Sequence, residues 1–408
     1  IGRITGDYYY QPKYGFPHRR PVKWLAFDEW KLQPAKGSKN PEGLQTTVYE
    51  IKQYHNMVDI ERHIQNQTSR VIEIRPDYEI KRLSGLPGRI QSILERKGQV
   101  ILYGPPGTGK TYLAEITALD LAALYQHGKP YKELTDDQKK EISSVGTDNG
   151  GTVRICCFHP GYGYEDFIEG YRPESVNNQM VFNLTDGIFK KICKKAKANP
   201  KFKYYLIIDE INRGDIPRIF GELLTVIEKN KRGKSIILPL SGETFQVPEN
   251  VFIIGTMNTA DRSIALLDTA LRRRFGFIEL MPDSSVLGDA VLNGIPLGPW
   301  LDSLNKRICE SVGRDARNLQ IGHSYLLEGG RPVSSFSKFS KLVQEEIIPL
   351  LEEYCYEDYS SLEKILGKSL VDINNQVIRH ELFEANKKDE LIQALLEPCP
   401  DISTTALA

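Results

Sequence analysis

The chain has 408 residues, so we expect two or three domains and not a single core. Lys plus Arg and Asp plus Glu balance at 53 each, which excludes a bulk field that would draw the whole molecule onto DNA or an acidic membrane. The six cysteines form no C-x-x-C pair and no apolar run approaches a membrane span, which favours a cytoplasmic protein with reduced thiols, no zinc site and no membrane partner.

Residues 1–60 differ in composition from the rest, because the tyrosines Tyr8–Tyr10 stand among Gly and Pro residues. Such a composition is typical of short strands joined by turns, and Lys31–Gly43 predicts a loop. We expect the remnant of a small β-rich N-terminal domain plus a linker, from a longer protein because the sequence begins without a Met. The alternative is part of a nucleic-acid reader that uses its aromatic side chains with Arg19 and Arg20.

From Gln99 onward, short apolar runs alternate with amphipathic helical patterns, which predicts a parallel α/β sheet. The expected strands are Gln99–Gly104, Thr152–Phe158, Lys203–Asp209, Asn250–Thr256 and Phe275–Leu280. Ser235–Val247 predicts a hairpin, and its composition does not decide what it contacts. Beyond Pro282 helical periodicity dominates, so we expect an α/β subdomain over 61–282 and a helical subdomain over 283–408.

A phosphate-binding motif follows the first of these strands. The string GPPGTGKT, Gly104–Thr111, matches G-x-x-x-x-G-K-[ST] and opens a helix, and we call it the phosphate loop. Its backbone N–H groups would wrap the phosphates, Lys110 would supply a point charge, and Thr111 would offer a hydroxyl to Mg²⁺. The expected nucleotide-binding residues are Gly104, Pro105, Pro106, Gly107, Thr108, Gly109, Lys110, Thr111 and Tyr112.

Two acidic residues end the third predicted strand, in YYLIIDEINR. Ligands of parallel sheets bind at the carboxyl ends of the strands, so Asp209 is expected beside Mg²⁺ and Glu210 beside a water that attacks the γ-phosphate. An Asp-Glu pair, where a small GTPase has Asp-x-x-Gly, favours a hydrolysing ATPase-like machine.

The fourth strand runs into IIGTMNTADRS, Ile253–Ser263. A guanine reader would need an Asp that accepts from the base, whereas a phosphate sensor needs one polar side chain at the end of a strand near the phosphate loop. Asn258 is in that position, so we interpret Asn258–Asp261 as a sensor loop. Three arginines follow at positions 272–274, where a positive group can reach a neighbouring subunit's γ-phosphate, and we expect at least Arg272 only to pair with a carboxylate.

A second guanine-box candidate is NKKD, Asn386–Asp389, which fits N-K-x-D literally. It lies in a charged helical pattern with no buried strand before it, so we interpret it as a solvated helix face.

In their order these motifs resemble an AAA+ module of the McrB family. Further segments carry the same resemblance, namely FHPGYGYEDFIEGYRP (158–173), the text around DEINR and MNTADRS, QIGHSYL (320–326) and IIPLLEEYCYED (347–358). This family comprises the motor subunits of McrBC modification-dependent restriction systems. The resemblance covers residues 95–360. It implies an AAA+ P-loop NTPase with a parallel sheet and a helical C-terminal lid.

The resemblance also implies function. McrB proteins prefer GTP to ATP, form hexameric rings, read modified DNA through a variable N-terminal domain and recruit McrC, which stimulates hydrolysis and carries the nuclease. It implies Mg²⁺ at Thr111 and Asp209, and catalytic roles for Glu210, Asn258, Asp261, Arg273 and Arg274. The departure from the family is Tyr131–Gly151, a charged insertion that we expect to be a surface excursion.

Two other functions stay open, namely an ATP-driven remodelling protein and a nucleotide-gated scaffold with negligible hydrolysis.

Four further side chains have two interpretations each. His323 either approaches the nucleotide or is a structural histidine. Tyr162, Tyr164 and Tyr171 are expected to pack in the core, the alternative being contact with DNA in a ring pore.

Overall fold

The computed structural model describes residues 82–143, 151–176, 179–261, 269–313, 315–356 and 358–403, together with four short strands near the N-terminus. The chain divides into two units, Ile1–Glu79 and Ile80–Ala408. In the first unit, β1 pairs with β4 and β2 pairs with β3, both antiparallel. These strands are β1 Gly2–Ile4, β2 Tyr9–Tyr10, β3 His18–Arg19 and β4 Val22–Trp24. The predicted loop at Lys31–Gly43 lies outside the described residues.

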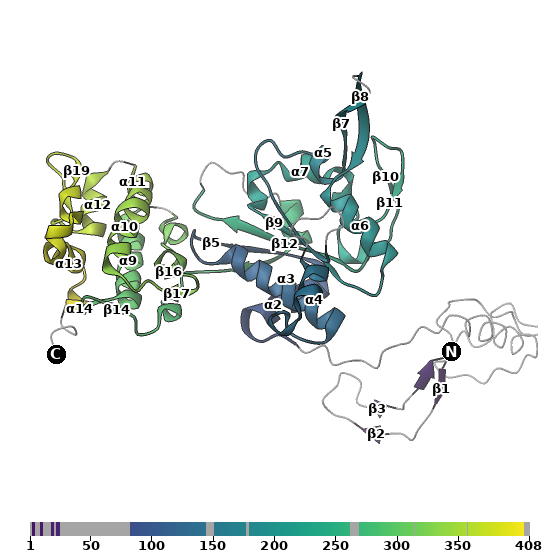
Figure 1. Cartoon of the computed structure of the whole chain (residues 1–408), viewed down its shortest axis with the longest axis horizontal. Coiled ribbons are helices and arrows are strands. Elements are labelled where there is room, and N and C mark those ends of the chain that lie inside the picture. The colour runs from purple at the N-terminus through teal and green to yellow at the C-terminus, as the bar shows by residue number, and fades with distance from the viewer. Residues whose placement is uncertain are drawn as a thin grey trace, which may run out of the picture. The chain divides into compact units, whose positions relative to one another are not determined.

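A five-stranded parallel sheet forms the centre of the second unit (Figure 1). Its strands are β5 Gln99–Gly104, β6 Val153–Cys157, β9 Tyr204–Asp209, β12 Val251–Asn258 and β13 Gly276–Glu279, in the order β13-β5-β12-β9-β6. The five strands predicted from the sequence are confirmed. Because β12 lies between β5 and β9, the ends of the three motif-bearing strands meet at one edge of the sheet.

Helices cover both faces of this sheet, in agreement with apolar strands buried on two sides. Val100 and Leu102 face α2 Gly85–Lys97, α3 Lys110–His127 and α4 Asp136–Ile142. Ile101 points to the other face, which packs on α5 Tyr164–Phe167, α6 Ile188–Ala198, α7 Ile216–Phe220 and α8 Thr269–Arg274.

The described part of the insertion Tyr131–Gly151 lies mostly on the surface, as expected, but it folds into a helix that is anchored in the core. It contains α4, whose N-terminus Thr135 closes with a capping box that includes Gln138. Leu134 and Ile142, which flank the charged helix, are 5% and 0% exposed and pack on the face that α3 covers. The charges of the segment therefore lie on one side of a helix whose ends are anchored in the core.

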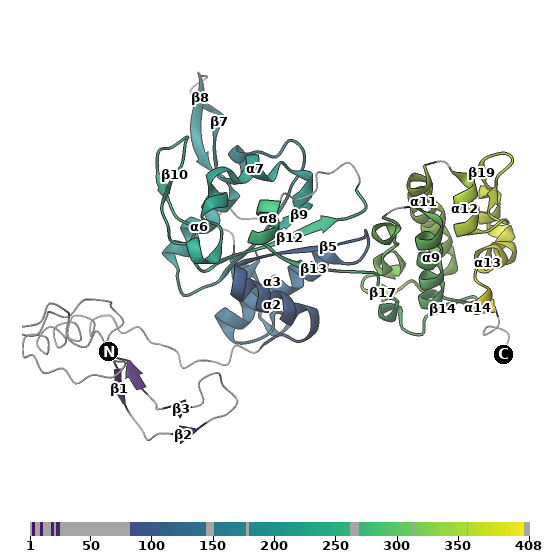
Figure 2. The same cartoon turned by 180° about the vertical axis from the view of Figure 1, so that it is seen from behind.

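Two hairpins extend from the side of the sheet that α5, α6, α7 and α8 cover (Figure 2). The expected one at Ser235–Val247 forms β10 Ile236–Ile237 and β11 Thr244–Phe245. The other, β7 Glu169–Val176 with β8 Gln179–Asp186, was not foreseen. Tyr162 and Tyr164 pack against the core as expected, whereas Tyr171 on β7 is 55% exposed, because this strand leaves the body of the domain.

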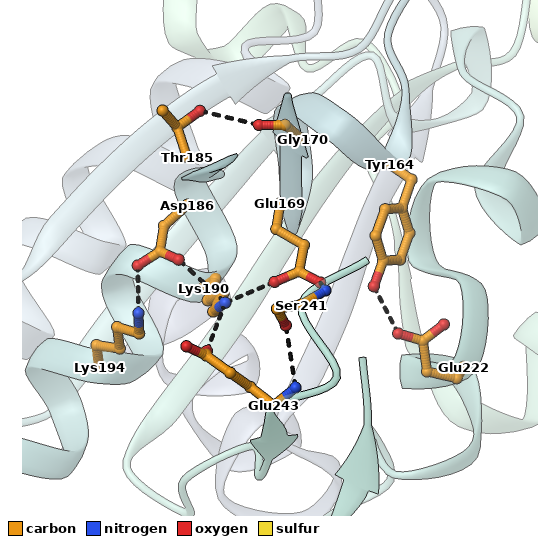
Figure 3. A network of polar contacts seen from close by, with 10 residues as sticks. All are labelled: Tyr164, Glu169, Gly170, Thr185, Asp186, Lys190, Lys194, Glu222, Ser241 and Glu243. Atoms are coloured by element: carbon orange, nitrogen blue, oxygen red, sulfur yellow. Dashed lines mark hydrogen bonds and ion pairs between the residues drawn. The ribbon is translucent and has the colours of Figure 1, made fainter. Parts of the chain in front are cut away.

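A buried lysine joins the base of the β7–β8 hairpin to the turn of the β10–β11 hairpin (Figure 3). Lys190 of α6 is 2% exposed, and its Nζ lies 2.6 Å from Glu169 at the start of β7 and 3.1 Å from Asp186 at the end of β8. The same Nζ lies 2.8 Å from Glu243 in the β10–β11 turn. The other oxygen of Glu169 accepts from the N–H of Ser241, so both hairpins are tied to one cation.

After β13 the chain forms a helical lid with its own core. Its helices are α9 Leu297–Ser311, α10 Phe336–Leu342, α11 Ile348–Cys355, α12 Tyr359–Leu366, α13 Lys388–Leu396 and α14 Pro400–Ser403. Three two-stranded hairpins connect them, namely β14 Val291–Leu292 with β15 Ile295–Pro296, β16 Leu327–Glu328 with β17 Arg331–Pro332, and β18 Val371–Asp372 with β19 Val377–Ile378. The NKKD string lies at the start of α13, with Asn386 exposed, so it is part of a helical segment as interpreted.

All six cysteines are free thiols. Within the described ranges, no helix combines the length and the apolar character that crossing a membrane requires.

Candidate functional site

The phosphate loop connects β5 to α3 at the carboxyl edge of the sheet. Gly107 has a φ of +72°, and a Cβ at this position would lie 2.5 Å from the Tyr325 ring, so a side chain is excluded on both grounds. The N-cap of α3 is Gly109, which provides no side-chain cap, and the first N–H groups of this 18-residue helix stay available to an anion.

Lys110 is 6% exposed and points back into the loop. Its Nζ donates to the carbonyl oxygens of Gly104 at 3.1 Å and Pro105 at 2.7 Å. Burial lowers the pKa of Lys110 to about 8, opposed by the charges of Glu210 and Asp209. Phosphate groups in this loop would favour the protonated amine, because they bring negative charge to a site that has little water.

Asp209 at the end of β9 joins the phosphate loop to the neighbouring strand. Its Oδ1 accepts from the hydroxyl of Thr111 at 2.6 Å and from the hydroxyl of Thr256 on β12 at 2.6 Å. Mg²⁺ in nucleotide sites usually takes one or two oxygen ligands from the protein and the rest from phosphates and water. The oxygens of Thr111 and Asp209 therefore fit a magnesium ion carried in with a nucleotide.

Glu210 follows directly and is held in an unusual backbone conformation, with φ of +51°. Its N–H donates to the Thr256 hydroxyl at 3.2 Å, and Oε1 of its carboxylate accepts from the Asn258 side-chain amide. Burial raises the pKa of Glu210, and the charge of Arg213 opposes this shift. A carboxylate with a raised pKa beside a phosphate-binding loop is suited to accept a proton from water.

The sensor loop lies against this carboxylate. Arg213 places its Nε 3.5 Å from Glu210 and donates from Nη2 to Asp261 at 2.9 Å. Asn212 donates to the carbonyl oxygen of Asn258 at 3.3 Å, so both ends of the described loop are held by residues that follow β9. The structure thus brings the predicted Glu210, Asn258 and Asp261 together.

Sequence reasoning missed three residues of this arrangement: Thr256, Asn212 and Arg213. Thr256 lies on the neighbouring strand and bonds both Asp209, at the end of β9, and Glu210, just after it, a contact that depends on strand order. Asn212 and Arg213 stand in the quoted DEINR motif, so their position beside a strand end was the available signal.

The predicted arginines lie at the end of α8. Arg274 places its Nε 3.3 Å from Glu228, whereas Arg272 and Arg273 are exposed. The carboxylate pairing expected for Arg272 is therefore made by Arg274. Tyr112, predicted beside the nucleotide, is 67% exposed on the first turn of α3.

Three family models match the chain. Residues 99–275 match the AAA domain (dynein-related subfamily), and residues 296–363 match McrB, alpha-helical lid domain. Residues 1–52 match a domain of unknown function, DUF8426. The matches to the AAA domain and the lid follow the boundary between the sheet and the helical core.

Similar proteins include the Type IV methyl-directed restriction enzyme EcoKMcrB subunit of Escherichia coli, 38% identical over 69% of this chain and 60% of that protein. The Type II restriction enzyme BsuMI component YdiS of Bacillus subtilis is 27% identical over 43% of this chain and 55% of its own length. Peroxisomal ATPase pex6 of Schizosaccharomyces pombe is 25% identical over 40% of this chain and 18% of its own. The chain thus spans less than two thirds of each of these relatives.

Proposed function

This chain is a McrB-type AAA+ protein, and on that premise we propose that it is the GTP-hydrolysing motor subunit of a modification-dependent DNA restriction complex. In this proposal it works as a homo-oligomeric ring, six subunits being the family's arrangement, and a McrC-like nuclease subunit stimulates it and cleaves the DNA. The E. coli and B. subtilis relatives, both components of restriction enzymes by name, support this assignment.

The observation that carries the proposal is the contact between the predicted water-activating carboxylate and the sensor loop. Glu210 would accept a proton from the attacking water, and Asn258, bonded to the same carboxylate, would hold it in position. Lys110 and the N–H groups of the phosphate loop would bind the phosphates. Thr111 and Asp209 would hold Mg²⁺, which supplies positive charge to the phosphate oxygens when bound.

The arginines of α8 support the proposal that the subunits form a ring. Arg273 is exposed at the end of this helix, while Arg274 pairs with Glu228. We assign Arg273 as the first candidate for a finger that stabilises the γ-phosphate of a neighbouring subunit, with Arg274 as the second.

Kinship with McrB proteins supports GTP over ATP. The similarity to the peroxisomal ATPase favours a second candidate, an ATP-driven remodelling protein, although it covers 18% of that relative. Competition separates the two: GTP should displace a labelled GTP analogue at a much lower concentration than ATP does. Equal displacement by ATP would favour the remodelling protein.

The experiment that tests the proposal measures phosphate release from GTP and ATP, with and without a co-encoded McrC-like subunit. We expect slow hydrolysis of GTP alone and faster hydrolysis with the partner. Asn258→Ala should lower the stimulated rate by about 10²-fold, because the catalytic carboxylate loses its amide partner. Asn386→Ala, in the exposed NKKD string, is the matched control and should leave the rate unchanged. Asn258→Ala with the activity of wild type would contradict the proposal. A wild-type protein that prefers ATP to GTP would contradict it as well.

A further inference from the structure

A short lid segment, Gly322–Tyr325, contacts the phosphate loop. The N–H of Gly322 donates to the carbonyl oxygen of Pro106 at 3.0 Å, and the N–H of Ser324 donates to that of Gly107 at 2.9 Å. A Cβ on Gly322 would lie 1.9 Å from the carbonyl carbon and oxygen of Gly107, so the two backbones touch directly. The position of this lid segment is therefore fixed relative to the phosphate loop.

His323 stands in the middle of this contact, and its tautomer follows from its hydrogen bond. Nδ1 accepts from the backbone N–H of Asp283 at 3.1 Å, so a neutral ring carries its proton on Nε2. Burial lowers the pKa of His323, with the charge of Asp283 opposing, which keeps the ring neutral near pH 7. The structure therefore presents Nε2–H as a donor.

This donor points at the phosphate loop. Nε2 lies 4.0 Å from the place where a Cβ on Gly109 would stand, and among the described residues it has no hydrogen-bond partner. Gly109 is the N-cap of α3, next to the N–H groups that an anion would occupy. His323 is half-buried, so its N–H donor, held beside this loop, is placed to donate to an oxygen of a bound nucleotide.

We propose that His323 is a nucleotide-binding residue, which donates a hydrogen bond from Nε2 to an oxygen of the nucleoside triphosphate on the Gly109 side of the phosphate loop. This inference rests on the proposed nucleotide site and extends it to the lid. Because the same segment touches Pro106 and Gly107, a nucleotide that engages His323 holds the lid against the phosphate loop. The geometry assigns this role to neutral imidazole.

The test compares His323→Asn and His323→Gln with His380→Asn. A Gln side chain places an N–H donor near the position of Nε2, whereas Asn is too short to do so. His380 is an exposed lid histidine whose Nδ1 lies 3.5 Å from Gln344, far from the phosphate loop in the sequence, and serves as the matched control. The measurements are the Kd for a non-hydrolysable GTP analogue and the Tm without nucleotide.

We expect His323→Asn to weaken binding about 10- to 100-fold, the loss of one hydrogen bond to a charged acceptor, with the nucleotide-free Tm within a few degrees of wild type. His323→Gln should recover most of the affinity and His380→Asn should match wild type. An affinity of His323→Asn equal to wild type, or an equal loss in His323→Gln, would overturn the donor role. If the wild-type protein binds no nucleotide, the proposed function fails; if it binds and His323→Asn binds equally well, only this inference fails.

Discussion

Replacing Lys190 with Met removes a buried cation that three carboxylates share. Glu169 is 0% exposed, so the substitution leaves its charge without a cation in a place that water does not reach. Removing one partner of a buried ion pair costs about 3–5 kcal/mol, and Met keeps most of the volume of the lysine stem. For a domain of 150–250 residues this corresponds to a decrease in Tm of roughly 6–20 °C.

Differential scanning fluorimetry at pH 7 measures this loss. Lys194→Met is the matched control, because Lys194 is half exposed and contacts Asp186 on the surface at 2.6 Å, a pair worth at most about 1 kcal/mol. The double substitution Lys190→Met with Glu169→Gln should recover part of the Tm, since the unpaired charge is gone. A decrease for Lys190→Met no larger than that for Lys194→Met would refute the reasoning.

The same network has a pH signature. Burial alone would raise the pKa of Glu169, but hydrogen bonds from Lys190 and Ser241 lower it below its ordinary 4.5. A carboxylate with a lowered folded-state pKa contributes stability above its unfolded value, and this stability is lost as the pH falls through the folded value. The Tm difference between wild type and Lys190→Met should therefore persist at pH 5–8 and shrink below about pH 4.5.

Three further predictions concern the nucleotide site. Arg213→Ala should lower kcat about tenfold with little change in KM, because the sensor loop loses its ion pair, and Arg213→Lys should retain more activity; steady-state kinetics would contradict this if KM alone changed. Gly322→Ala should weaken nucleotide binding, because its Cβ has no room against the phosphate loop, whereas Gly313→Ala, with open space around it, should bind as wild type does in the same titration. Arg273→Ala should abolish most turnover while leaving the Kd for nucleotide intact, and mixing this variant with an excess of wild type tests action between subunits. Arg274→Ala should chiefly lower the Tm, because Arg274 pairs with Glu228. If Arg274→Ala abolished turnover and Arg273→Ala lowered the Tm, the two residues would exchange roles.

The strand ends were predictable because local signals coincide there. The phosphate loop, the acidic pair Asp209-Glu210 at the end of β9 and the amide of Asn258, the last residue of β12, each follow a buried apolar run, and parallel strands bring their carboxyl ends to one edge. The contact of Asn258 with Glu210 follows from this topology, since β12 and β9 are neighbours.

Other features depend on contacts that are distant in sequence. The β7–β8 hairpin has exposed side chains along β7, so no alternation of buried and exposed residues marks it as a strand. Lys190 appears in the sequence as one of several lysines on α6, and its burial depends on a turn more than fifty residues later. His323 and the phosphate loop are more than two hundred residues apart, so only the folded lid shows that they meet.

The central claim is that Glu210 activates the water that hydrolyses the nucleotide, and the single-turnover rate of Glu210→Gln tests it most directly. Gln keeps the size of the side chain and can still contact Asn258, but it cannot accept a proton at neutral pH. In the presence of the nuclease subunit we predict GTP hydrolysis lowered by about 10²- to 10⁴-fold, with the Kd for GTP within a few-fold of wild type. Hydrolysis at the wild-type rate by Glu210→Gln would contradict the account.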